Sequence, residues 1–576
     1  MRLVSRYPLI PILILGLLLA APLLNEHLVP AGDNSTYLIL GQALATGQGY
    51  KMISDPRSPD MGLYPPGYPL LLAAVQALTG TQRNLRASVL PSKLLSVVLY
   101  LGTLLLIYEL LLPRNPALAV ATTLLTAVNP QMLYYATEVS TEIPYLFLSL
   151  GCLWAFERYL RRPTAGTLGG AIMVLVLAFY VRSIALVMAA AFALYLAVRQ
   201  PSPPAQNAGW STYRSGRETQ SAGTRRPAAR PQRFRPALLL LLSVLVLEAP
   251  WFIWSRALPG TGTSVGLGRG YFDLYFTSDP YGTAPASLSD WVARLAQNVR
   301  SYVFEIWPTV LFPHAERIST ALGVVGSAFA LLISLLLLFG FLLEAWRGHV
   351  SEWYVTTFFA SCVTYMWAQS RLIVPIVPFA VHYFLVAIRT ALELGGSLLT
   401  GTPSRVVGGG ERLASLVRRI TVSAFGVACA VLTLSALVAE GRAVQRNLRY
   451  GLGKPLATYY QTSAEWSNYL QAMNWIAENG APDSTVICRK ADLLYIVTGH
   501  LALEYPYSQD ALALKRSILD NHVAYVIEDA FGWTGTTADY LRPALRAWVA
   551  AEPQALSLVF ETDSPQTRVW RVEKPN

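Results

Sequence analysis

The chain has 576 residues, of which 53% are hydrophobic and only 14% are charged, and its mean hydropathy is +0.39. A soluble protein would carry roughly a quarter charged residues, and the apolar residues here fall into runs near the ~20 residues that span a bilayer. The composition therefore excludes an ordinary soluble protein and indicates a polytopic α-helical membrane protein. The net charge of +11 does not indicate nucleic-acid binding, because eight arginines and one glutamate lie in a single Pro-, Ser- and Gly-rich segment, 199–235.

The amino-terminal stretch "MRLVSRYPLIPILILGLLLAAPLL" has a basic start followed by an apolar run. This pattern is typical either of a cleaved signal peptide or of an uncleaved first span. We favour the uncleaved span, because no small-residue cleavage site with a polar flank follows it. The topology described next also works with this segment retained.

Eleven apolar segments are predicted to span the membrane, with the amino terminus in the cytoplasm. They are approximately 8–25, 88–112, 116–134, 141–160, 166–181, 183–198, 236–255, 319–343, 351–369, 371–390 and 419–440. Every strongly basic loop, including the disordered arginine-rich loop 199–235, then falls on the cytoplasmic side, as the positive-inside rule requires. This holds only if 65–80 does not cross, so we predict a helix there that lies at the outer interface and is started by Pro65 and Pro66.

The predicted domains are a transmembrane domain over 1–440, with outer loops 26–87 and 256–318, and an extracytoplasmic α/β domain over 441–576. The runs "STVICR", "LALEYP", "VAYVIED", "SLVFETD" and "TRVWRV" in the tail are typical of strands. The runs "SAEWSNYLQAMNWIAENG", "QDALALKRSILDNH" and "ADYLRPALRAWVAAEPQ" are typical of helices. Alternating strand and helix patterns predict a small α/β fold.

The first outer loop carries the stretch "AGDNSTYLILGQALATGQGY", in which Asp33 precedes a helix-like run that ends near Gly47. Asp is a favoured N-cap residue, so Asp33 could simply start this helix. A carboxylate at the interface beside an apolar pocket would instead have a raised proton affinity, which suits a general base. Asn34 or Ser35 could cap equally well, so both interpretations stand at this stage.

A second acidic stretch, "YYATEVSTEIPYLF", contains Glu138 and Glu142 at the outer end of a span. Their i,i+4 spacing would put both on one helical face, although Pro144 indicates that the helix begins near Thr141. Glu142 would then belong to a capping pattern and favour the helix N-terminus. The functional interpretation is a carboxylate that faces Asp33 across the outer vestibule and holds a cation or orients a substrate.

Two arginines are predicted near the outer membrane level, where charge is costly and usually functional. Arg182 lies in "AFYVRSIALV" and Arg371 in "AQSRLIVPIVPF". Each is either a snorkelling or turn residue, or one of a pair that binds a phosphate bidentately. The sequence has no Walker loop and no HExxH motif, and its four cysteines lack metal-binding spacing.

In chain order, these features form one pattern: a first span, "GDNSTYLILGQALATGQGY", "YPPGYPLLLA", "STEIP" at a span start, Arg371 with Pro375 and Pro378, and a tail beginning "WIAEN". Over about 1–395 the pattern resembles bacterial membrane glycosyltransferases of the GT-C superfamily. It is similar to the branch that contains protein O-mannosyltransferases and the lipid A aminoarabinose transferase. The resemblance implies a GT-C fold in the bacterial inner (plasma) membrane and a polyprenyl-phosphate-linked sugar as donor, with no nucleotide.

The resemblance also assigns roles to residues. Asp33 matches the first-loop acid of the family, which is catalytic or lies beside a metal, and Glu142 matches an acid at the start of the fourth span. Arg182 and Arg371 resemble positions that contact the donor phosphate. Tyr64, together with Glu138, completes the predicted substrate-binding set.

This chain departs from the family at two places. The aminoarabinose transferases have an acid and a lysine before Pro-Pro, where this sequence has Leu63 and Tyr64, and the mannosyltransferases have adjacent acids where Asp33 is followed by Asn34. The resemblance therefore leaves open a divalent metal held by Asp33 and Glu142. Either another aspartate of the first outer loop takes the place of the missing acid, or the reaction proceeds without a tightly held metal.

The sequence thus predicts an inverting glycosyltransferase that moves a hexosyl or pentosyl group from a polyprenyl-phosphate donor to an acceptor hydroxyl. The transfer is expected on the outer face of the membrane, with a protein, glycolipid or polysaccharide as acceptor. The alternative is a membrane transporter or lipid flippase. Transporters usually contain internal repeats and charges near the bilayer midplane, whereas this sequence shows no repeat and gathers its charges at one face.

Overall fold

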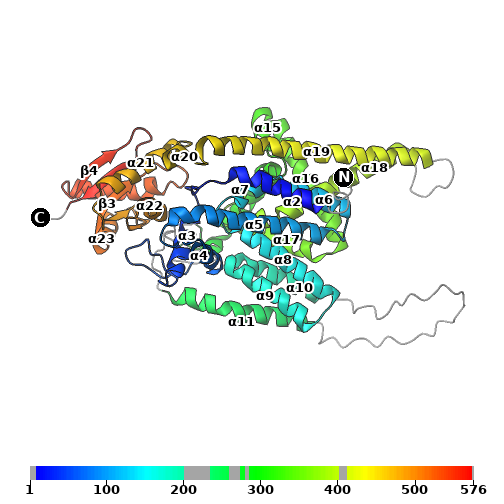
Figure 1. Ribbon diagram of the computed structural model, residues 1–576, viewed down its shortest axis with the longest axis horizontal. Coiled ribbons are helices and arrows are strands. Elements are labelled where there is room, and N and C mark those ends of the chain that lie inside the picture. Colours follow the sequence, from blue (N-terminus) through cyan, green and yellow to red (C-terminus); the bar gives the residue numbers. More distant parts are fainter. Residues whose placement is uncertain (1–7, 200–233, 259–272, 279–283, 401–410, 574–576) are drawn as a thin grey trace.

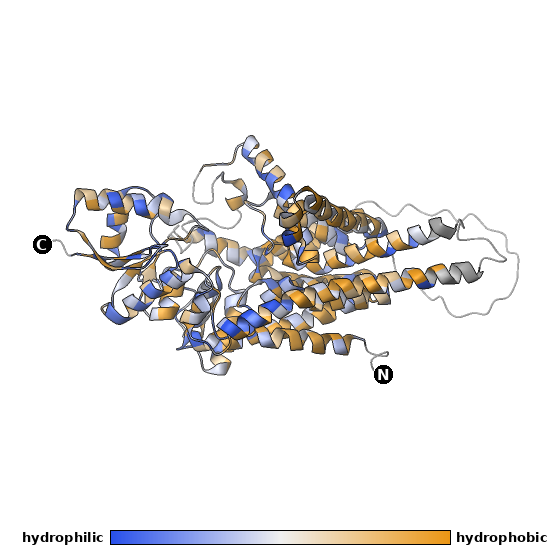
Figure 2. Cartoon of the chain, turned by 90° about the horizontal axis from the view of Figure 1, so that it is seen from above, coloured by the Kyte–Doolittle hydropathy of each residue, from blue (hydrophilic) through white to orange (hydrophobic). Residues whose placement is uncertain are grey.

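The computed structural model describes residues 8–199, 234–258, 273–278, 284–400 and 411–573 (Figure 1). Nearly all of the predicted arginine-rich loop 199–235 lies outside these residues. A bundle of long helices makes up one end of the molecule, and a smaller domain with a sheet makes up the other (Figure 1). Hydrophobic residues dominate the helices of the bundle, whereas the sheet domain mixes hydrophilic and hydrophobic residues (Figure 2).

The helical part is made of α-helices and short helical turns that are joined by loops. They are α2 (Leu9–Ala20), η1 (Ala21–Leu23), α3 (Asn34–Ala45), α4 (Gly67–Thr79), α5 (Leu85–Leu111), α6 (Pro116–Ala127), α7 (Pro130–Ala136), α8 (Glu142–Arg161), α9 (Ala165–Val181), η2 (Ser183–Ala185), α10 (Leu186–Val198), α11 (Arg235–Ala257), α12 (Asp273–Phe276), α13 (Leu288–Ser301), the π-helical turn η4 (Tyr302–Ile306), α14 (Trp307–Leu311), α15 (Ala315–Leu322), α16 (Val324–Arg347), α17 (Val350–Thr364), η5 (Val374–Ile376), α18 (Val377–Thr400) and α19 (Glu411–Tyr450).

Among the described residues, five helices are long and apolar enough to cross a membrane. They are Leu85–Leu111, Arg235–Ala257, Val324–Arg347, Val374–Gly396 and Arg419–Tyr450. Shorter apolar helices cover most of the predicted spans 8–25, 166–181 and 183–198, and Pro116–Ala127 covers the first part of 116–134. A mostly helical chain with five candidate membrane spans is therefore confirmed, while the count of eleven spans and the orientation stay predictions.

Two predicted spans are not continuous helices. The segment 116–134 breaks between α6 and α7, where the Asn129 side chain accepts hydrogen bonds from the backbone N–H groups of Gln131 and Met132 and starts a new helix at Pro130. Proline at the first helical position needs no N–H partner, so an Asn-Pro pair is a helix start. The segment 319–343 breaks at Gly323, whose φ of +53° interrupts the helix between α15 and α16.

The predicted helix at 65–80 is present as α4, which packs against α3. Gly41 permits this approach, since a Cβ there would lie 3.1 Å from the Leu72 Cβ. Gly67, in the "PPGYP" motif, is required for a second contact, because a Cβ there would lie 2.6 Å from the Tyr180 carbonyl. The motif thus holds the start of α4 against the carboxyl end of α9.

The C-terminal part has the predicted mixture of strands and helices. Its elements are α20 (Leu456–Tyr460), α21 (Ala464–Asn479), β1 (Thr485–Ile487), α22 (Ala491–Thr498), β2 (Ala502–Leu503), α23 (Ala511–Asp520), β3 (Val523–Glu528), η6 (Thr537–Leu541), α24 (Arg542–Ala551), β4 (Leu556–Glu561) and β5 (Arg568–Val572). The five strands form one sheet in the order β2-β1-β3-β5-β4. β1 pairs in parallel with β2 and β3, and β5 pairs antiparallel with β3 and β4.

Asp529, directly after β3, predicts how the stability of this domain depends on pH. Its side chain is fully buried and accepts hydrogen bonds from the Phe531 N–H and the Thr537 hydroxyl, and burial raises the pKa of Asp529 to about 6. A carboxyl group whose pKa is raised by folding stabilises the protein below its unfolded pKa, near 4, and this stability is lost as pH rises through 6. We expect a total loss of about 3 kcal/mol, of which about 2 kcal/mol falls between pH 4.5 and 8. Asp529→Asn should remove most of this loss in thermal unfolding curves measured from pH 4.5 to 8.

The control for this experiment is Asp483→Asn, at an exposed aspartate of the same domain. This variant should keep the pH dependence of the wild type. If Asp529→Asn and wild type lose stability in parallel as pH rises, the assignment to Asp529 is wrong.

Candidate active site

Asp33 does not cap the helix that it precedes. It occupies the N-cap position of α3, yet its side chain makes no capping hydrogen bond. Its Oδ2 instead accepts a hydrogen bond from Arg371 Nη1 at 3.1 Å, across 338 residues of sequence. The capping interpretation of Asp33 is therefore wrong, and its partly exposed carboxylate is held toward Arg371.

Glu142 joins both arginines that the sequence analysis singled out. It is the first residue of α8 and is fully buried. Its Oε1 accepts a hydrogen bond from Arg182 Nη1 at 2.8 Å and another from Arg371 Nε. Asp33, Arg371, Glu142 and Arg182 therefore form one continuous network of ion pairs.

Short irregular segments at helix ends place the two arginines. Arg182 is the C-cap of α9, where the chain turns into η2. Gly67 packs against Tyr180, two residues earlier, so the "PPGYP" motif supports this turn. Arg371 follows α17 and precedes η5, and Gln131 of α7 donates to the backbone carbonyl of Ser370 beside it. Because different elements anchor the two guanidinium groups, their positions are fixed independently of each other.

The C-terminal domain contributes a further cation. Lys490 Nζ donates to the Gly32 carbonyl at 3.0 Å, one residue before Asp33. Lys490 thus adds a third cationic side chain near Asp33, and the carboxylates of Asp492 and Glu504 lie close to Lys490 itself. Sequence analysis missed Lys490, since no local pattern shows that α22 packs on α3.

Tyrosine rings pack together in the protein interior next to Asp33. The buried Tyr37 lies 5.0 Å from the ring of Tyr64 and 5.2 Å from that of Tyr68, both in edge-on geometry. Burial, reinforced by the Asp33 charge, raises the pKa of Tyr37 well above its ordinary value, so its phenol stays neutral. Tyr64, predicted to bind substrate, is buried behind Tyr37, and its backbone carbonyl accepts a hydrogen bond from Tyr50. Tyr64 is thus a structural neighbour of the ion-pair network.

Glu138 lies in a different cluster from Glu142. It falls in the turn between α7 and α8, and its carboxylate pairs with the fully buried Lys93 at 3.2 Å. Lys93 also donates to Asn25 Oδ1 at 3.0 Å, and the Asn25 amide donates to Asn447 at 2.7 Å. Glu138 and Glu142 therefore do not share a helical face, because the helix begins only at Glu142. The geometry gives Glu138 a role in joining α5, the first outer loop and α19.

The described residues do not fit a divalent metal at the predicted ligands Asp33 and Glu142. Both carboxylates are paired with Arg371, and Glu142 is also paired with Arg182. Arg371 and Arg182 engage Asp33 Oδ2 and Glu142 Oε1, and their positive charges would repel a cation from the remaining oxygens, including the buried Glu142 Oε2, which has no hydrogen-bond partner within the part of the chain that the structure describes. Nowhere in the described ranges do three or more His, Cys, Asp or Glu side chains form a group that could hold a metal ion.

Asp492 fastens the C-terminal domain to the first outer loop. Its Oδ2 accepts a hydrogen bond from the Thr36 hydroxyl, and its Oδ1 accepts one from Ser54 at 3.1 Å, with all three side chains buried. Asp492→Ala would leave both hydroxyls without this acceptor, at a cost of about 1–3 kcal/mol for each. We expect proteases to cleave within 26–87 faster than in the wild type, as measured by mass spectrometry of the fragments. We also expect slower catalysis, because Thr36 is in the first turn after Asp33.

Asp520→Ala, at an exposed position of α23, is the matched control for this variant. It should be cleaved at the wild-type rate. Wild-type cleavage of Asp492→Ala as well would show that this contact does not hold the first outer loop.

Comparison with known proteins places the fold. A family model described as dolichyl-phosphate-mannose-protein mannosyltransferase matches residues 64–206. The structure of ArnT from Cupriavidus metallidurans bound to undecaprenyl phosphate matches with a TM-score of 0.51 and 12% identity, over 97% of this chain and 97% of ArnT. The archaeal oligosaccharyltransferase AglB from Archaeoglobus fulgidus, in complex with an inhibitory peptide and a dolichol-phosphate, matches with a TM-score of 0.53 and 11% identity, over 99% of this chain and 75% of AglB. No curated protein sequence matches the chain significantly.

The chain has the fold of the GT-C superfamily. The GT-C fold predicted from the sequence is therefore confirmed. The matched family segment, 64–206, includes Glu142 and Arg182, while Asp33 and Arg371 lie outside it. In this chain, tertiary packing alone brings the four residues together.

Proposed function

We propose that the protein is an inverting glycosyltransferase that uses a polyprenyl-phosphate-linked sugar on the outer face of the membrane. The observation that carries this proposal is the network in which Arg371 bridges Asp33 and Glu142. It sets a partly exposed carboxylate next to guanidinium groups suited to a phosphate. A proton acceptor and an anion site are the two parts that displacement of a phosphate from a sugar requires.

In the proposed reaction, the acceptor hydroxyl oxygen attacks the anomeric carbon of the donor sugar. The new glycosidic C–O bond forms as the bond from that carbon to the phosphate oxygen breaks, and the bonding pair leaves with polyprenyl phosphate. Asp33 takes the hydroxyl proton, and one displacement inverts the anomeric centre. Arg371 and Arg182 stabilise the negative charge that grows on the departing phosphate.

Glu142 has a positioning role in this scheme. Its buried carboxylate fixes both guanidinium groups before any donor binds. Groups that are preorganised in this way do not need to reorient as charge develops. Because the described carboxylates are already engaged by arginines, we propose that transfer does not require a divalent metal.

The family match and the GT-C fold support glycosyl transfer as the general activity. The two compared structures carry undecaprenyl phosphate and dolichol-phosphate, which supports a lipid phosphate as part of the donor. The acceptor class is left to experiment, as are the sugar and the bacterial inner membrane as location. The C-terminal domain, docked beside Asp33 through Lys490 and Asp492, is the natural place for acceptor selection.

The test uses the full chain in nanodiscs with a panel of radiolabelled polyprenyl-phosphate sugars, with and without EDTA. We expect release or transfer of sugar from at least one donor, at the same rate after EDTA treatment. If EDTA abolishes transfer and Mg²⁺ or Mn²⁺ restores it, the metal-free scheme is wrong. If no donor binds or reacts, and the protein reconstituted in sealed liposomes scrambles lipid between the leaflets, the protein is a transporter rather than a transferase.

A further inference from the structure

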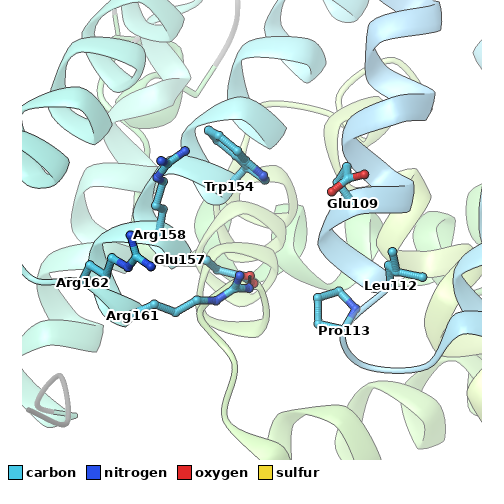
Figure 3. Close-up of a pocket in the computed structure, with 8 residues that line it drawn as sticks. All are labelled: Glu109, Leu112, Pro113, Trp154, Glu157, Arg158, Arg161 and Arg162. Atoms are coloured by element: carbon cyan, nitrogen blue, oxygen red, sulfur yellow. Dashed lines mark hydrogen bonds and ion pairs between the residues drawn. The ribbon is translucent and has the colours of Figure 1, made fainter. Parts of the chain in front are cut away.

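A pocket of about 370 Å³ opens at the other end of α8 from Glu142. It lies between the carboxyl ends of α5 and α8, and its lining side chains face one another across the gap (Figure 3). The lining residues are Glu109, Leu112, Pro113, Trp154, Glu157, Arg158, Arg161 and Arg162. Its volume falls within the roughly 300–1,000 Å³ range of small-molecule sites.

The last turn of α8 supplies three arginines to this pocket. Arg161 is paired with Glu157 at 3.0 Å, and the Arg158 guanidinium lies 5.5 Å from the centre of the Trp154 ring. Within the described ranges, the side chains of Arg158 and Arg162 form no ion pair or hydrogen bond. Two guanidinium groups therefore face the pocket with their donors available to a ligand.

The carboxylates of the pocket do not cancel this positive charge. Glu157 is shared with Arg161 and also with Arg114, which lies outside this pocket, at 3.4 Å. Glu109 is exposed on the opposite wall, on α5. The pocket therefore favours an anion.

One helical turn before the arginines, toward the middle of α8, the surface of the protein has exposed apolar side chains. Trp154 is 41% exposed, and Leu105, one turn before Glu109 on α5, is 43% exposed. Tryptophan is enriched where a membrane protein meets the lipid–water boundary. Cations next to an exposed apolar surface match a ligand that is anionic at one end and hydrocarbon at the other.

We propose that this pocket binds the phosphodiester head group of an anionic membrane phospholipid. Arg158 and Arg162 donate to the phosphate oxygens, and Trp154 packs against the glycerol and the start of the acyl chains. Basic pockets between membrane helices bind anionic head groups in this way, and anionic lipids are attracted to arginine-rich membrane surfaces. The site lies at the far end of α8 from the proposed catalytic network, and its ligand does not depend on glycosyl transfer.

The experiment measures protection of individual arginines in the full-length protein in detergent. Phenylglyoxal labels accessible guanidinium groups, and mass spectrometry reports the labelling rate at each site. We expect dihexanoyl-phosphatidylglycerol to slow labelling of Arg158 and Arg162 about tenfold, equivalent to roughly 1.4 kcal/mol of protection. Exposed Arg317, on another helix, should be labelled at the same rate throughout.

Two further ligands distinguish the source of the anion. Dihexanoyl-phosphatidylcholine should give no protection, since its head group has no net charge, and inorganic phosphate at the same concentration should give little. Equal protection by phosphate would overturn a lipid ligand in favour of a soluble anion. Equal protection by phosphatidylcholine, or none by phosphatidylglycerol, would overturn the site.

A second measurement uses native mass spectrometry of the double variant Arg158→Gln/Arg162→Gln, with Arg317→Gln as the control at an exposed arginine outside the pocket. The double variant should lose most of the retained anionic lipid, and the control should keep it. Retention of lipid by a folded double variant contradicts the proposal. If the double variant does not fold, protection of the wild-type arginines decides the question.

Discussion

Asp33→Asn is expected to reduce glycosyl transfer by roughly 10²–10⁴-fold, the usual contribution of a positioned general base. The asparagine can still accept a hydrogen bond from Arg371 Nη1, which lies 3.1 Å from the native carboxylate. The ion-pair network around Glu142 should therefore stay in place, and only the ability to take a proton is lost. The measurement is the steady-state transfer rate over a range of donor concentrations, together with donor binding at equilibrium.

The kinetic signature separates this role from a structural one. We expect kcat to fall while donor binding stays near that of the wild type, because Arg182, Arg371 and Glu142 are unchanged. Asp60→Asn is the matched control, since Asp60 lies in the same loop and faces a cation, Lys51, at 4.0 Å. Wild-type turnover in Asp33→Asn, in protein shown to be folded, would remove Asp33 from the reaction.

The residues of the network could be identified from the sequence, but their pairing could not. Each of the four stands at the end of an apolar segment, where a charged group is costly and therefore conspicuous. Which carboxylate meets which guanidinium depends on how helices far apart in sequence pack. Asp33 and Arg371 are separated by 338 residues, and Arg371 and Glu142 by 229.

Local sequence signals explain which of the predicted elements are present in the structure and which are not. The tail's alternating patterns predicted all five strands, because β-rich runs between turns are informative by themselves. The break at Asn129-Pro130 was also visible as a helix-start signal, but the hydropathy of 116–134 concealed it. Lys490 and Asp492 carried no signal, since their importance comes from the docking of α22 on α3.

Arg371 is expected to be the most sensitive cation of the site. Its guanidinium donates through Nη1 to Asp33 and through Nε to Glu142, so it fixes the distance between the base and the anion site. Lysine keeps the charge but has one compact ammonium that cannot reproduce a planar fork. We expect Arg371→Lys and Arg371→Gln to lower kcat/KM by roughly 10²–10³-fold, the range for loss of one preorganised donor to transition-state charge.

Kinetics and a double variant distinguish two explanations of that loss. If Arg371 binds the donor phosphate, Arg371→Gln raises KM for the donor and lowers kcat, whereas Arg317→Gln, an equal charge change at an exposed position, does neither. If Arg371 only neutralises the buried Glu142, then Arg371→Gln/Glu142→Gln should be as active as Glu142→Gln alone, because the charge that Arg371 neutralises is absent from both. A double variant that is less active than Glu142→Gln alone therefore assigns Arg371 a role beyond neutralising Glu142, as expected for a cation that binds the phosphate. Equal activity would leave Arg182 and Lys490 as the cations that bind the donor, because both remain at the site when Arg371 is neutral.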